Sequence, residues 1–394
     1  MGYKTYTCPI AKRCGGCELL AVPYELQLKR KQHAMNELFA EVCAADEVSV
    51  EAIRGMDVPL AYRHKAATPF APGSRATGRR MRCGFYERGT HRIVYCPECL
   101  VEAKGARSIL RDVARVADEL HIRAYEEDRG RGVLRHAVVR VGYATDEVLL
   151  TLVTNGPDLP RATELVHRLR KRHPRITSVV QNVNDRCTNA ILGTRNRTLF
   201  GAGIMHDRLL GCTFEIGPTS FYQTNPAQTE VLYQLALEGI DETSSLLDAY
   251  CGTGTIGICA AAAAQRGSRD LSVVGVEQVS NAVGCARRNA RANDLADLCR
   301  FVCADATSWM AEQQRASFDA VVLDPPRAGS TPEFLHGVVQ LAPQRIAYVS
   351  CNPTTQVRDL AILREGGYRV NRIIPVDLFP HTKHVECVAL MARH

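Results

Sequence analysis

In its second half the chain reads Asp248-Ala249-Tyr250-Cys251-Gly252-Thr253-Gly254-Thr255-Ile256-Gly257. An apolar run, Leu246 to Ala249, leads into the glycines, so we expect a strand that turns into a helix. The glycines follow a G-x-G-x-x-G pattern, which lets the backbone approach a nucleotide-like ligand closely. Glu277 ends the next expected strand about 20 residues later, where a ribose hydroxyl would be bound. The pattern fits a dinucleotide site or an S-adenosylmethionine site.

Strands and helices alternate around this stretch. The expected strands are Leu246 to Ala249, Val273 to Val276, Arg300 to Val302, Ala320 to Leu323 and Ile346 to Val349. That alternation predicts a parallel, doubly wound, Rossmann-like sheet of the α/β class. The last two segments, Arg369 to Leu378 and Val385 to Met391, have no helix between them. We therefore expect the sheet to end in an antiparallel hairpin.

Two acidic residues favour a methyl donor over a dinucleotide. Asp248 precedes the glycines, where the amino acid part of a cationic donor would lie. Asp305 ends the third expected strand, where an adenine amino group could be met. Both positions are at carboxyl ends of parallel strands, where ligands of such sheets bind.

Two more motifs end the fourth and fifth strands. They are Asp324-Pro325-Pro326-Arg327 and Ser350-Cys351-Asn352-Pro353. Because both follow parallel strands, we expect them to face one crevice. A cysteine exposed at a strand end and followed by Asn-Pro is placed like a nucleophile, whereas a core cysteine would need no turn. An iron–sulfur, nucleotide-dependent oxidoreductase is the alternative from another class, but it would leave both motifs without a use.

The composition is that of a soluble globular protein. Of 394 residues, 46% are hydrophobic and 23% charged, and the length suggests two or three domains. No apolar run approaches membrane-spanning length, and Met1 to Pro9 lack the apolar core of a signal peptide. We expect a cytoplasmic protein without membrane contact.

The charge is distributed unevenly along the chain. Residues 1–206 carry 33 Lys+Arg against 22 Asp+Glu, a net charge of +11, whereas residues 207–394 carry 16 against 20, a net charge of −4. A basic first half joined to a mildly acidic second half predicts that the first holds a polyanion and the second carries out the chemistry.

Residues 60–183 predict a compact α+β module of short strands, two helices and a hairpin. Its arginine-rich loop and its basic helix, Arg161 to His173, are candidate RNA contacts. The contacts expected are Arg75, Arg79, Arg80, Arg82, Arg168, Arg170, Lys171 and Arg172. Upstream, Val22 to Phe39 is periodic like a helix, and its basic side, Lys29 to Lys31, is expected to face solvent or a phosphate.

Near the amino terminus, Cys8, Cys14 and Cys17 fall within ten residues, and Cys96 and Cys99 flank Pro97-Glu98. Three thiols so close together are hard to explain as packing. Cys14, Cys17, Cys96 and Cys99 would suit a four-thiolate zinc site. The additional Cys8, which is followed by proline, leans towards an iron–sulfur cluster.

Together these motifs resemble the RNA uracil-C5 methyltransferase family, which includes 23S rRNA m5U enzymes and tRNA m5U54 enzymes. The resemblance rests on Phe221-Tyr222-Gln223-Thr224-Asn225, Asp248 to Gly254, Asp324 to Arg327, Ser350 to Pro353 and His384-Val385-Glu386. It implies that Cys351 is the nucleophile and Glu386 the proton acceptor. It also assigns a [4Fe-4S] cluster to Cys8, Cys14, Cys17 and Cys96.

The resemblance further implies donor or substrate binding by Gln223, Tyr250, Glu277 and Asp324. The strand-end reasoning adds four residues to the predicted S-adenosylmethionine site, namely Gly252, Gly254, Thr255 and Asp305. The expected domains are an iron–sulfur segment (1–19), a helical segment packed on the methyltransferase domain (20–51), a central RNA-binding domain (52–219) and the methyltransferase domain (220–394).

Many relatives begin with a β-barrel RNA-binding domain for which this chain has no room, so we expect the central domain to bind RNA. We expect a monomer acting on 23S rRNA, with the tRNA m5U54 reaction as the alternative. Uracil C5 is a poor nucleophile, but a thiolate added at C6 turns the ring into an enolate. We expect Cys351 to supply that thiolate, provided that a positive neighbour such as Arg327 lowers its pKa.

Overall fold

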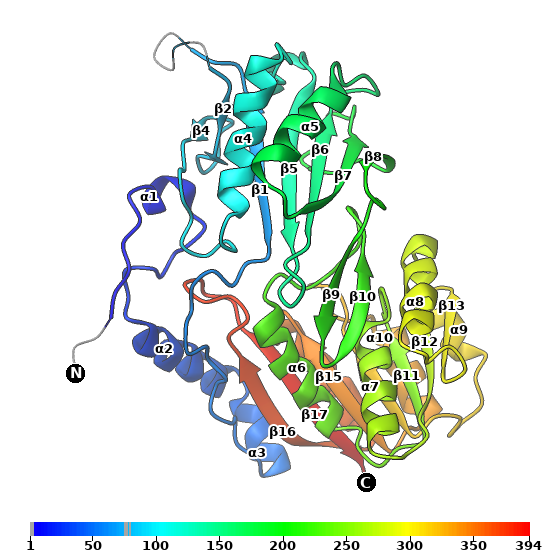
Figure 1. Cartoon of the computed structure of the whole chain (residues 1–394). Helices are drawn as coiled ribbons and strands as arrows, with labels where there is room; N and C mark the ends of the chain where they lie inside the picture. The colour runs from blue at the N-terminus through cyan, green and yellow to red at the C-terminus, as the bar shows by residue number, and fades with distance from the viewer. Residues whose placement is uncertain (1–3, 75–77, 79) are drawn as a thin grey trace.

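The computed structural model describes residues 4–74, 78 and 80–394, which form two α/β units (Figure 1). The predicted RNA contacts Arg75 and Arg79 lie outside the described residues. Within the described part of the chain, no helix combines the length and the apolar composition that a membrane crossing requires.

The C-terminal unit contains a seven-stranded sheet in the order β13-β12-β11-β14-β15-β17-β16. The first five strands are parallel, and β17 lies antiparallel to both β15 and β16. The predicted mostly parallel sheet with an antiparallel terminal hairpin is confirmed. The strands are β11 (Ser245–Ala249), β12 (Ser272–Glu277), β13 (Cys299–Cys303), β14 (Ala320–Leu323), β15 (Arg345–Ser350), β16 (Tyr368–Val376) and β17 (Glu386–Arg393).

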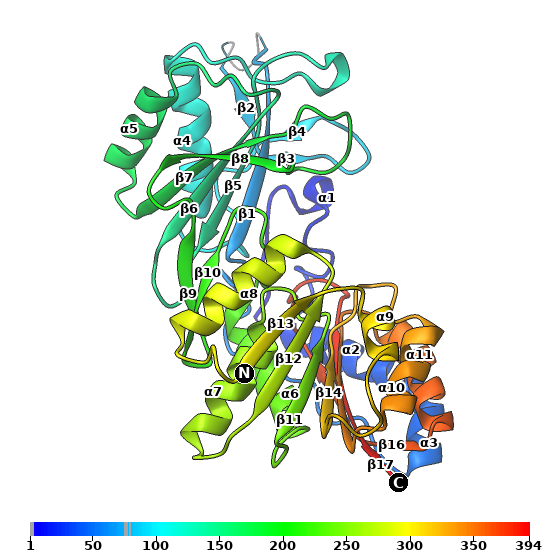
Figure 2. The same ribbon diagram turned by 90° about the vertical axis from the view of Figure 1, so that its right-hand side faces the viewer.

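Helices cover both faces of this sheet (Figure 2). One face packs on α6 (Pro226–Glu238), α7 (Thr255–Arg266) and α8 (Ser280–Ala292), and the other on α9 (Ala306–Ala311), α10 (Pro332–Leu341) and α11 (Pro353–Glu365). Successive residues of β14 alternate between the two cores, with Val322 in the first and Val321 in the second. Because both faces are buried, the strands are continuous apolar runs rather than alternating ones.

The N-terminal helices belong to the packing of the C-terminal unit. Figure 1 shows α2 (Tyr24–Leu38) and α3 (Ala40–Asp46) beside β16, and Met35, Phe39 and Val42 share a core with Val321. The expectation that Lys31 faces solvent or a phosphate is wrong. Its side chain is 4% exposed, and its Nζ lies 2.6 Å from a carboxylate oxygen of the buried Asp377.

The central unit is a six-stranded sheet in the order β2-β1-β5-β6-β7-β8. Its core packs against α4 (Ala106–Glu119) and α5 (Ala162–Arg172). The predicted hairpin around residues 143–146 is confirmed, because β5 and β6 pair antiparallel. The strands are β1 (Lys65–Ala71), β2 (Arg82–Cys83), β5 (Leu134–Val141), β6 (Val148–Thr154), β7 (Ile176–Val183) and β8 (Arg195–Phe200), with a small hairpin of β3 (Phe85–Tyr86) and β4 (Ile93–Val94) beside them.

A hairpin of β9 (Met205–Leu209) and β10 (Cys212–Ile216) connects the two units. Met205 and Ile216 pack with Leu149 of the central sheet, whereas Phe214 belongs to the core under α7 and α8. Neither this hairpin nor β8 is predicted by the sequence pattern. In β8 the first four residues are all exposed, so the period-two apolar signal of a half-buried strand is absent.

Candidate active site

A cavity of about 770 Å³ opens at the carboxyl ends of β11, β12, β14 and β15. The predicted nucleophile and the predicted base both line it, as do most of the predicted donor-site residues. The predicted residues in its wall are Gln223, Tyr250, Gly252, Thr255, Glu277, Asp324, Cys351 and Glu386. Two predicted residues, Gly254 and Asp305, are not part of the wall.

One half of the cavity is built by the turn from β11 into α7. The Gly252 backbone N–H donates to a Glu277 carboxylate oxygen at 3.3 Å, and the Gly257 N–H donates to Asp248 at 2.9 Å. Gly254 has φ of +79°, and a Cβ there would lie 2.8 Å from the Phe301 ring. Only glycine allows this turn, so Gly254 shapes the wall from behind.

The carboxylate of Asp248, at the base of this turn, has a hydrogen-bond partner within the described part of the chain for only one of its two oxygens. The second carboxylate oxygen of Asp248 is buried without a hydrogen-bond partner among the described residues. Burial raises the pKa of Asp248 to about 7, although the Gly257 N–H opposes the shift. A buried acceptor without a donor is suited to a ligand that brings a cation or an N–H group.

Asp305 is placed differently from its prediction. Its carboxylate accepts hydrogen bonds from the Ser308 backbone N–H at 2.9 Å and from the Ser308 hydroxyl at 3.1 Å, and so caps α9. Its charge still raises the pKa of Tyr250, after the larger effect of burial. Asp305 therefore lies near the cavity without lining it.

The other half of the cavity gathers Cys351, Asp324, Arg327 and Glu386 from three neighbouring strands. Cys351 is half-buried between the end of β15 and α11. Glu386, the first residue of β17, is 3% exposed. Because β17 lies next to β15 in the sheet, the carboxylate and the thiol face the same space.

The two carboxyl groups hold their protons unusually tightly. Burial, and then the charge of Asp324, raise the pKa of Glu386 to about 8, whereas Arg327 opposes the shift. Burial raises the pKa of Asp324 to about 7, even though part of its side chain faces the cavity. Perturbed carboxyl groups that converge in one cavity are typical of acid–base chemistry.

The expectation that Arg327 lowers the pKa of Cys351 is wrong in its net effect. Burial raises the pKa of the thiol, and the charges of Glu386 and Asp324 raise it further. Arg327 acts in the expected direction but is outweighed. These effects disfavour the thiolate of Cys351 in the free protein.

Comparison with known proteins identifies the family of the chain that forms this cavity. A family model described as tRNA (uracil-5-)-methyltransferase matches residues 210–394. An RNA methyltransferase of Halalkalibacterium halodurans is 40% identical over 98% of this chain and 82% of its own length. The chain belongs to the RNA uracil-5-methyltransferase family. A Bacillus cereus RNA methyltransferase is 38% identical over 99% of this chain and 83% of its own length.

A solved structure also matches the methyltransferase over nearly its whole length. It is the Pyrococcus abyssi tRNA (uracil-54, C5)-methyltransferase in complex with S-adenosyl-L-homocysteine. The TM-score is 0.78 and the identity 29%, and the match covers 98% of this chain and 87% of the other. The expected fold class is confirmed as that of an S-adenosylmethionine-dependent α/β methyltransferase.

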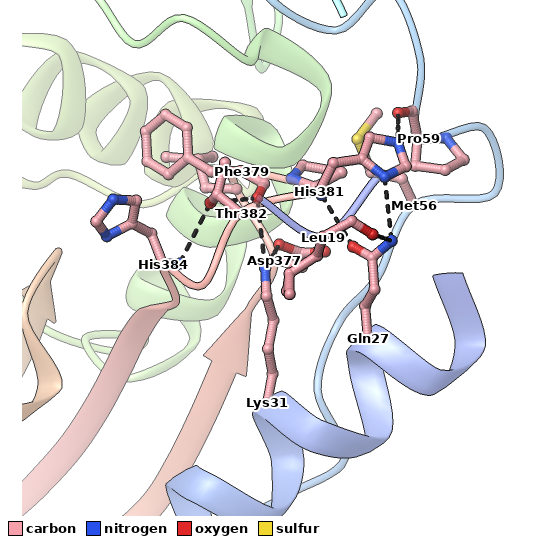
Figure 3. A network of polar contacts seen from close by, with 12 residues as sticks. Leu19, Gln27, Lys31, Met56, Pro59, Asp377, Phe379, His381, Thr382 and His384 are labelled. Atoms are coloured by element: carbon pink, nitrogen blue, oxygen red, sulfur yellow. Dashed lines mark hydrogen bonds and ion pairs between the residues drawn. The ribbon is translucent and has the colours of Figure 1, made fainter. Parts of the chain in front are cut away.

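One wall of the methyltransferase cavity comes from the loop between β16 and β17. Phe379, Thr382 and His384 of this loop line the cavity, yet only His384 stands in a motif that the sequence points to. Figure 3 shows how α2 holds the loop: Lys31 binds Asp377, and the Gln27 side chain contacts the His381 ring at 3.1 Å.

The same loop is tied to the cysteine-bearing segment. The Leu19 backbone N–H donates to the His381 carbonyl at 2.9 Å, and Gly16 lines the active-site cavity. Arg63 lines it too, from the approach to β1. The sequence gives little signal for Gly16 or Arg63, because each belongs to a segment far from the strand ends.

The amino-terminal cysteines of the methyltransferase lie near one another. Burial, followed by the neighbouring thiols Cys99, Cys14 and Cys8, raises the pKa of Cys17 to about 12. Burial also raises the pKa of Cys96 to about 12, with Cys99 and Cys8 adding to the effect. Among the described residues, however, no group of three or more His, Cys, Asp or Glu side chains is arranged to hold a metal ion.

Proposed function

We propose that this protein transfers a methyl group from S-adenosylmethionine to C5 of a uridine in RNA, most specifically in 23S rRNA. One observation carries the proposal. The thiol of Cys351 and the carboxyl group of Glu386 face the same cavity as the glycine turn of β11. A nucleophile, a base and a nucleotide-type site in one cavity are what this reaction requires.

The donor would be held at the β11 end of the cavity. Glu277 is placed for the ribose hydroxyls, while Gly252 and Thr255 offer backbone approach. The unsatisfied oxygen of Asp248 would accept from the donor's amino group. We assign the other contacts with the donor to Gln223, to Tyr250 and to the segment around Asp305.

The reaction would begin with addition of the Cys351 sulfur to C6 of the uracil. The thiol gives its proton to solvent water, the C6–S bond forms, and the electron pair of the C5–C6 double bond moves to give an enolate. C5 then attacks the methyl carbon of the sulfonium donor, and the electron pair of the broken S–CH₃ bond stays on sulfur. Glu386 must be ionised before the last step, because a protonated carboxyl group cannot accept the C5 proton.

Release would require Glu386 to remove the proton from C5. The electron pair of that C–H bond re-forms the C5–C6 double bond and expels the Cys351 sulfur. A carboxylate whose pKa is raised to about 8 is a stronger base than an ordinary glutamate. We assign to Asp324 the acceptance of a hydrogen bond from the N3–H of uracil. Because a stacked base hides C6, the uridine must be flipped out or already unpaired.

The proposal also specifies the class of RNA that the protein methylates. The +11 charge of residues 1–206 supports RNA binding by the first half of the chain but does not distinguish RNA classes. The likeness to the Pyrococcus abyssi enzyme favours a tRNA uridine as the alternative. We retain 23S rRNA as the proposed target and let one experiment decide between them.

Purified protein and S-adenosylmethionine labelled in the methyl group would be incubated separately with unmodified 23S rRNA and unmodified tRNA transcripts. Label in 5-methyluridine of 23S rRNA supports the proposal. Label only in tRNA overturns the rRNA target but retains the chemistry. Label in neither RNA, with wild-type protein that binds donor, would contradict the proposed function.

We further propose that Cys8, Cys14, Cys17 and Cys96 hold a [4Fe-4S] cluster with a structural role. The mutual effects of these thiols on their pKa values support their clustering. The thiolates of such a cluster each bind a different iron, so they need not touch one another. Anaerobically purified protein should contain iron and sulfide. One zinc per chain without sulfide would instead favour the zinc site that includes Cys99.

A further inference from the structure

Three basic side chains gather where the central sheet meets the active-site cavity. Lys65 and Arg140 are directly opposed in the β1–β5 ladder, and Arg63 precedes Lys65 by two residues. Like charges placed opposite each other across two strands destabilise a sheet. None of the three forms an ion pair with a carboxylate that the structure describes.

These side chains point away from the core of the central unit. Ala66 and Val139, their neighbours in sequence, belong to the core under α4, so alternation places Lys65 and Arg140 on the opposite face. On that face Leu149, the β6 partner of Arg140, packs with the β9–β10 hairpin and with the cavity residue Tyr222. Figure 1 shows that β1 starts and β5 ends on the side of the central sheet that faces the C-terminal unit.

Hydrogen bonds connect this corner to the cavity wall. One terminal nitrogen of Arg140 donates to the Ser220 carbonyl at 2.6 Å, next to Phe221 of the wall. The His64 backbone N–H donates to the Thr224 carbonyl at 2.7 Å, and Arg63 itself lines the cavity. The basic corner is thus adjacent to the place where a flipped uridine would enter.

Polar groups of this basic corner also lack partners among the described residues. Arg140 is 4% exposed, and its Nε is buried without a hydrogen-bond acceptor among the described residues. Burial, followed by the charges of Arg140 and Arg63, lowers the pKa of Lys65 to about 8, and no carboxylate opposes the shift. Buried donors without acceptors and unneutralised cations are costly, so such an arrangement is suited to an anionic ligand.

Resting on the proposed function, we infer that Lys65, Arg140 and Arg63 form a clamp for an RNA phosphate beside the target uridine. The clamp would fix the backbone at the cavity mouth while the base turns into the cavity. It would carry no sequence information, since phosphate contacts set position and register. The donor's own carboxylate is the competing anion, and the test separates the two.

The test compares Lys65→Met with the wild type in the full-length protein. The matched control is Lys104→Met, which removes an exposed lysine elsewhere in the central unit. Binding is measured over a series of salt concentrations with the unmodified 23S rRNA or tRNA transcript that the wild type methylates. Donor binding is measured by calorimetry with S-adenosylhomocysteine, and Tm by thermal unfolding.

Loss of one phosphate contact should reduce the log–log salt slope by about 0.7 on a single-stranded site. If the two proteins bind equally at 1 M salt, the variant should therefore bind about fivefold more weakly than the wild type at 0.1 M. Donor affinity should not change, and Tm should not fall, because a repulsive pair is removed. A structural lysine would instead lower Tm on substitution. Lys65→Gln is measured in parallel, so that a folding defect in one variant does not decide the outcome.

An unchanged slope in Lys65→Met and Lys65→Gln would overturn the clamp. Weaker donor binding with unchanged RNA binding would overturn it in favour of the donor carboxylate. An equal loss in Lys104→Met would show only a general effect of charge and would also overturn it. A wild-type protein that methylates neither RNA would instead contradict the proposed function.

Discussion

At the residue scale, Cys351 carries the first prediction. Its sulfur faces the cavity, but the turn expected to hold the donor belongs to β11 and α7. Cys351→Ala should therefore reduce methylation by at least a hundredfold and leave donor affinity within about twofold of the wild type. Single-turnover assays and calorimetry check both values. Retention of a few per cent of the activity would remove Cys351 from the nucleophile role.

Glu386 carries the second prediction. In Glu386→Gln the sulfur can still add and the methyl group can still transfer, but the C5 proton stays in place and the cysteine cannot leave. We expect a covalent protein–RNA adduct that survives denaturing electrophoresis. The double variant Cys351→Ala with Glu386→Gln is the control and should give no adduct. An inactive Glu386→Gln without adduct would assign the base to another group.

The same substitution should change stability in a pH-dependent way. Burial raises the folded-state pKa of Glu386 from 4.5 to about 8, so the folded state binds more protons than the unfolded state between these values. Folding stability contributed by this group therefore falls as pH rises through that window. Glu386→Gln should match the wild type near pH 4.5. The pKa difference of about 3.5 corresponds to roughly 5 kcal/mol, so above pH 8 Glu386→Gln should be more stable than the wild type by up to that amount and should unfold at a higher Tm.

Thermal unfolding of both proteins across this pH range measures the difference. A constant difference in Tm from pH 5 to 9 would show that Glu386 is not the titrating group. The prediction implies that the base is retained for chemistry at a cost in stability.

At the residue scale, the sequence could predict most of the cavity wall, because Glu277, Asp324 and Cys351 each stand at or beside a strand end that apolar runs define. It could not predict the raised pKa of Cys351. The two opposing charges, Glu386 and Asp324, come from other strands, and their proximity to the thiol depends on the order of strands in the sheet.

At the scale of elements, the contact between α2 and the β16–β17 loop gives the next prediction. Lys31→Met would leave the carboxylate of Asp377 buried with only the Tyr24 hydroxyl and local groups beside it. Removal of one partner of a buried ion pair costs about 3–5 kcal/mol. Because the loop carries Phe379 and His384 into the cavity, we expect a lower Tm together with weaker RNA binding.

Two variants make this prediction specific. Lys29→Met removes an exposed charge from the same helix and should have little effect. Lys31→Met combined with Asp377→Asn removes both charges and should recover much of the Tm. If the double variant is no more stable than Lys31→Met alone, the ion pair is not what holds the loop.

The ion pair between Lys31 and Asp377 could not be predicted from helical periodicity. Periodicity places Lys31 next to Lys29 and Arg30 on a basic side, but it contains no information about a partner that is distant in sequence. The elements that the sequence did reveal are those with long apolar runs or clear periodicity. The hairpin of β9 and β10 and the polar strand β8 lack such signals.

At the scale of the whole molecule, the two units divide the charge between them. RNA bound mainly by the first half of the chain should slow amide hydrogen exchange in the central unit and at the cavity rim. Helix α3, which lies at the end of the C-terminal unit remote from the central unit, should be unaffected (Figure 1). Hydrogen-exchange mass spectrometry with and without RNA measures this. Protection confined to the C-terminal unit would contradict RNA binding by the central one.

The strand order of the C-terminal sheet has a consequence for synthesis of the protein. β17 is the last strand in sequence, yet it lies between β15 and β16. Until the ribosome has released this strand, β15 has an open edge and Glu386 is absent from the cavity. If Cys351 and Glu386 act as proposed, a folded chain with the thiol but without the base would hold RNA as a covalent adduct. The proposed roles then predict that the late insertion of β17 completes the thiol and the base in the same step of folding.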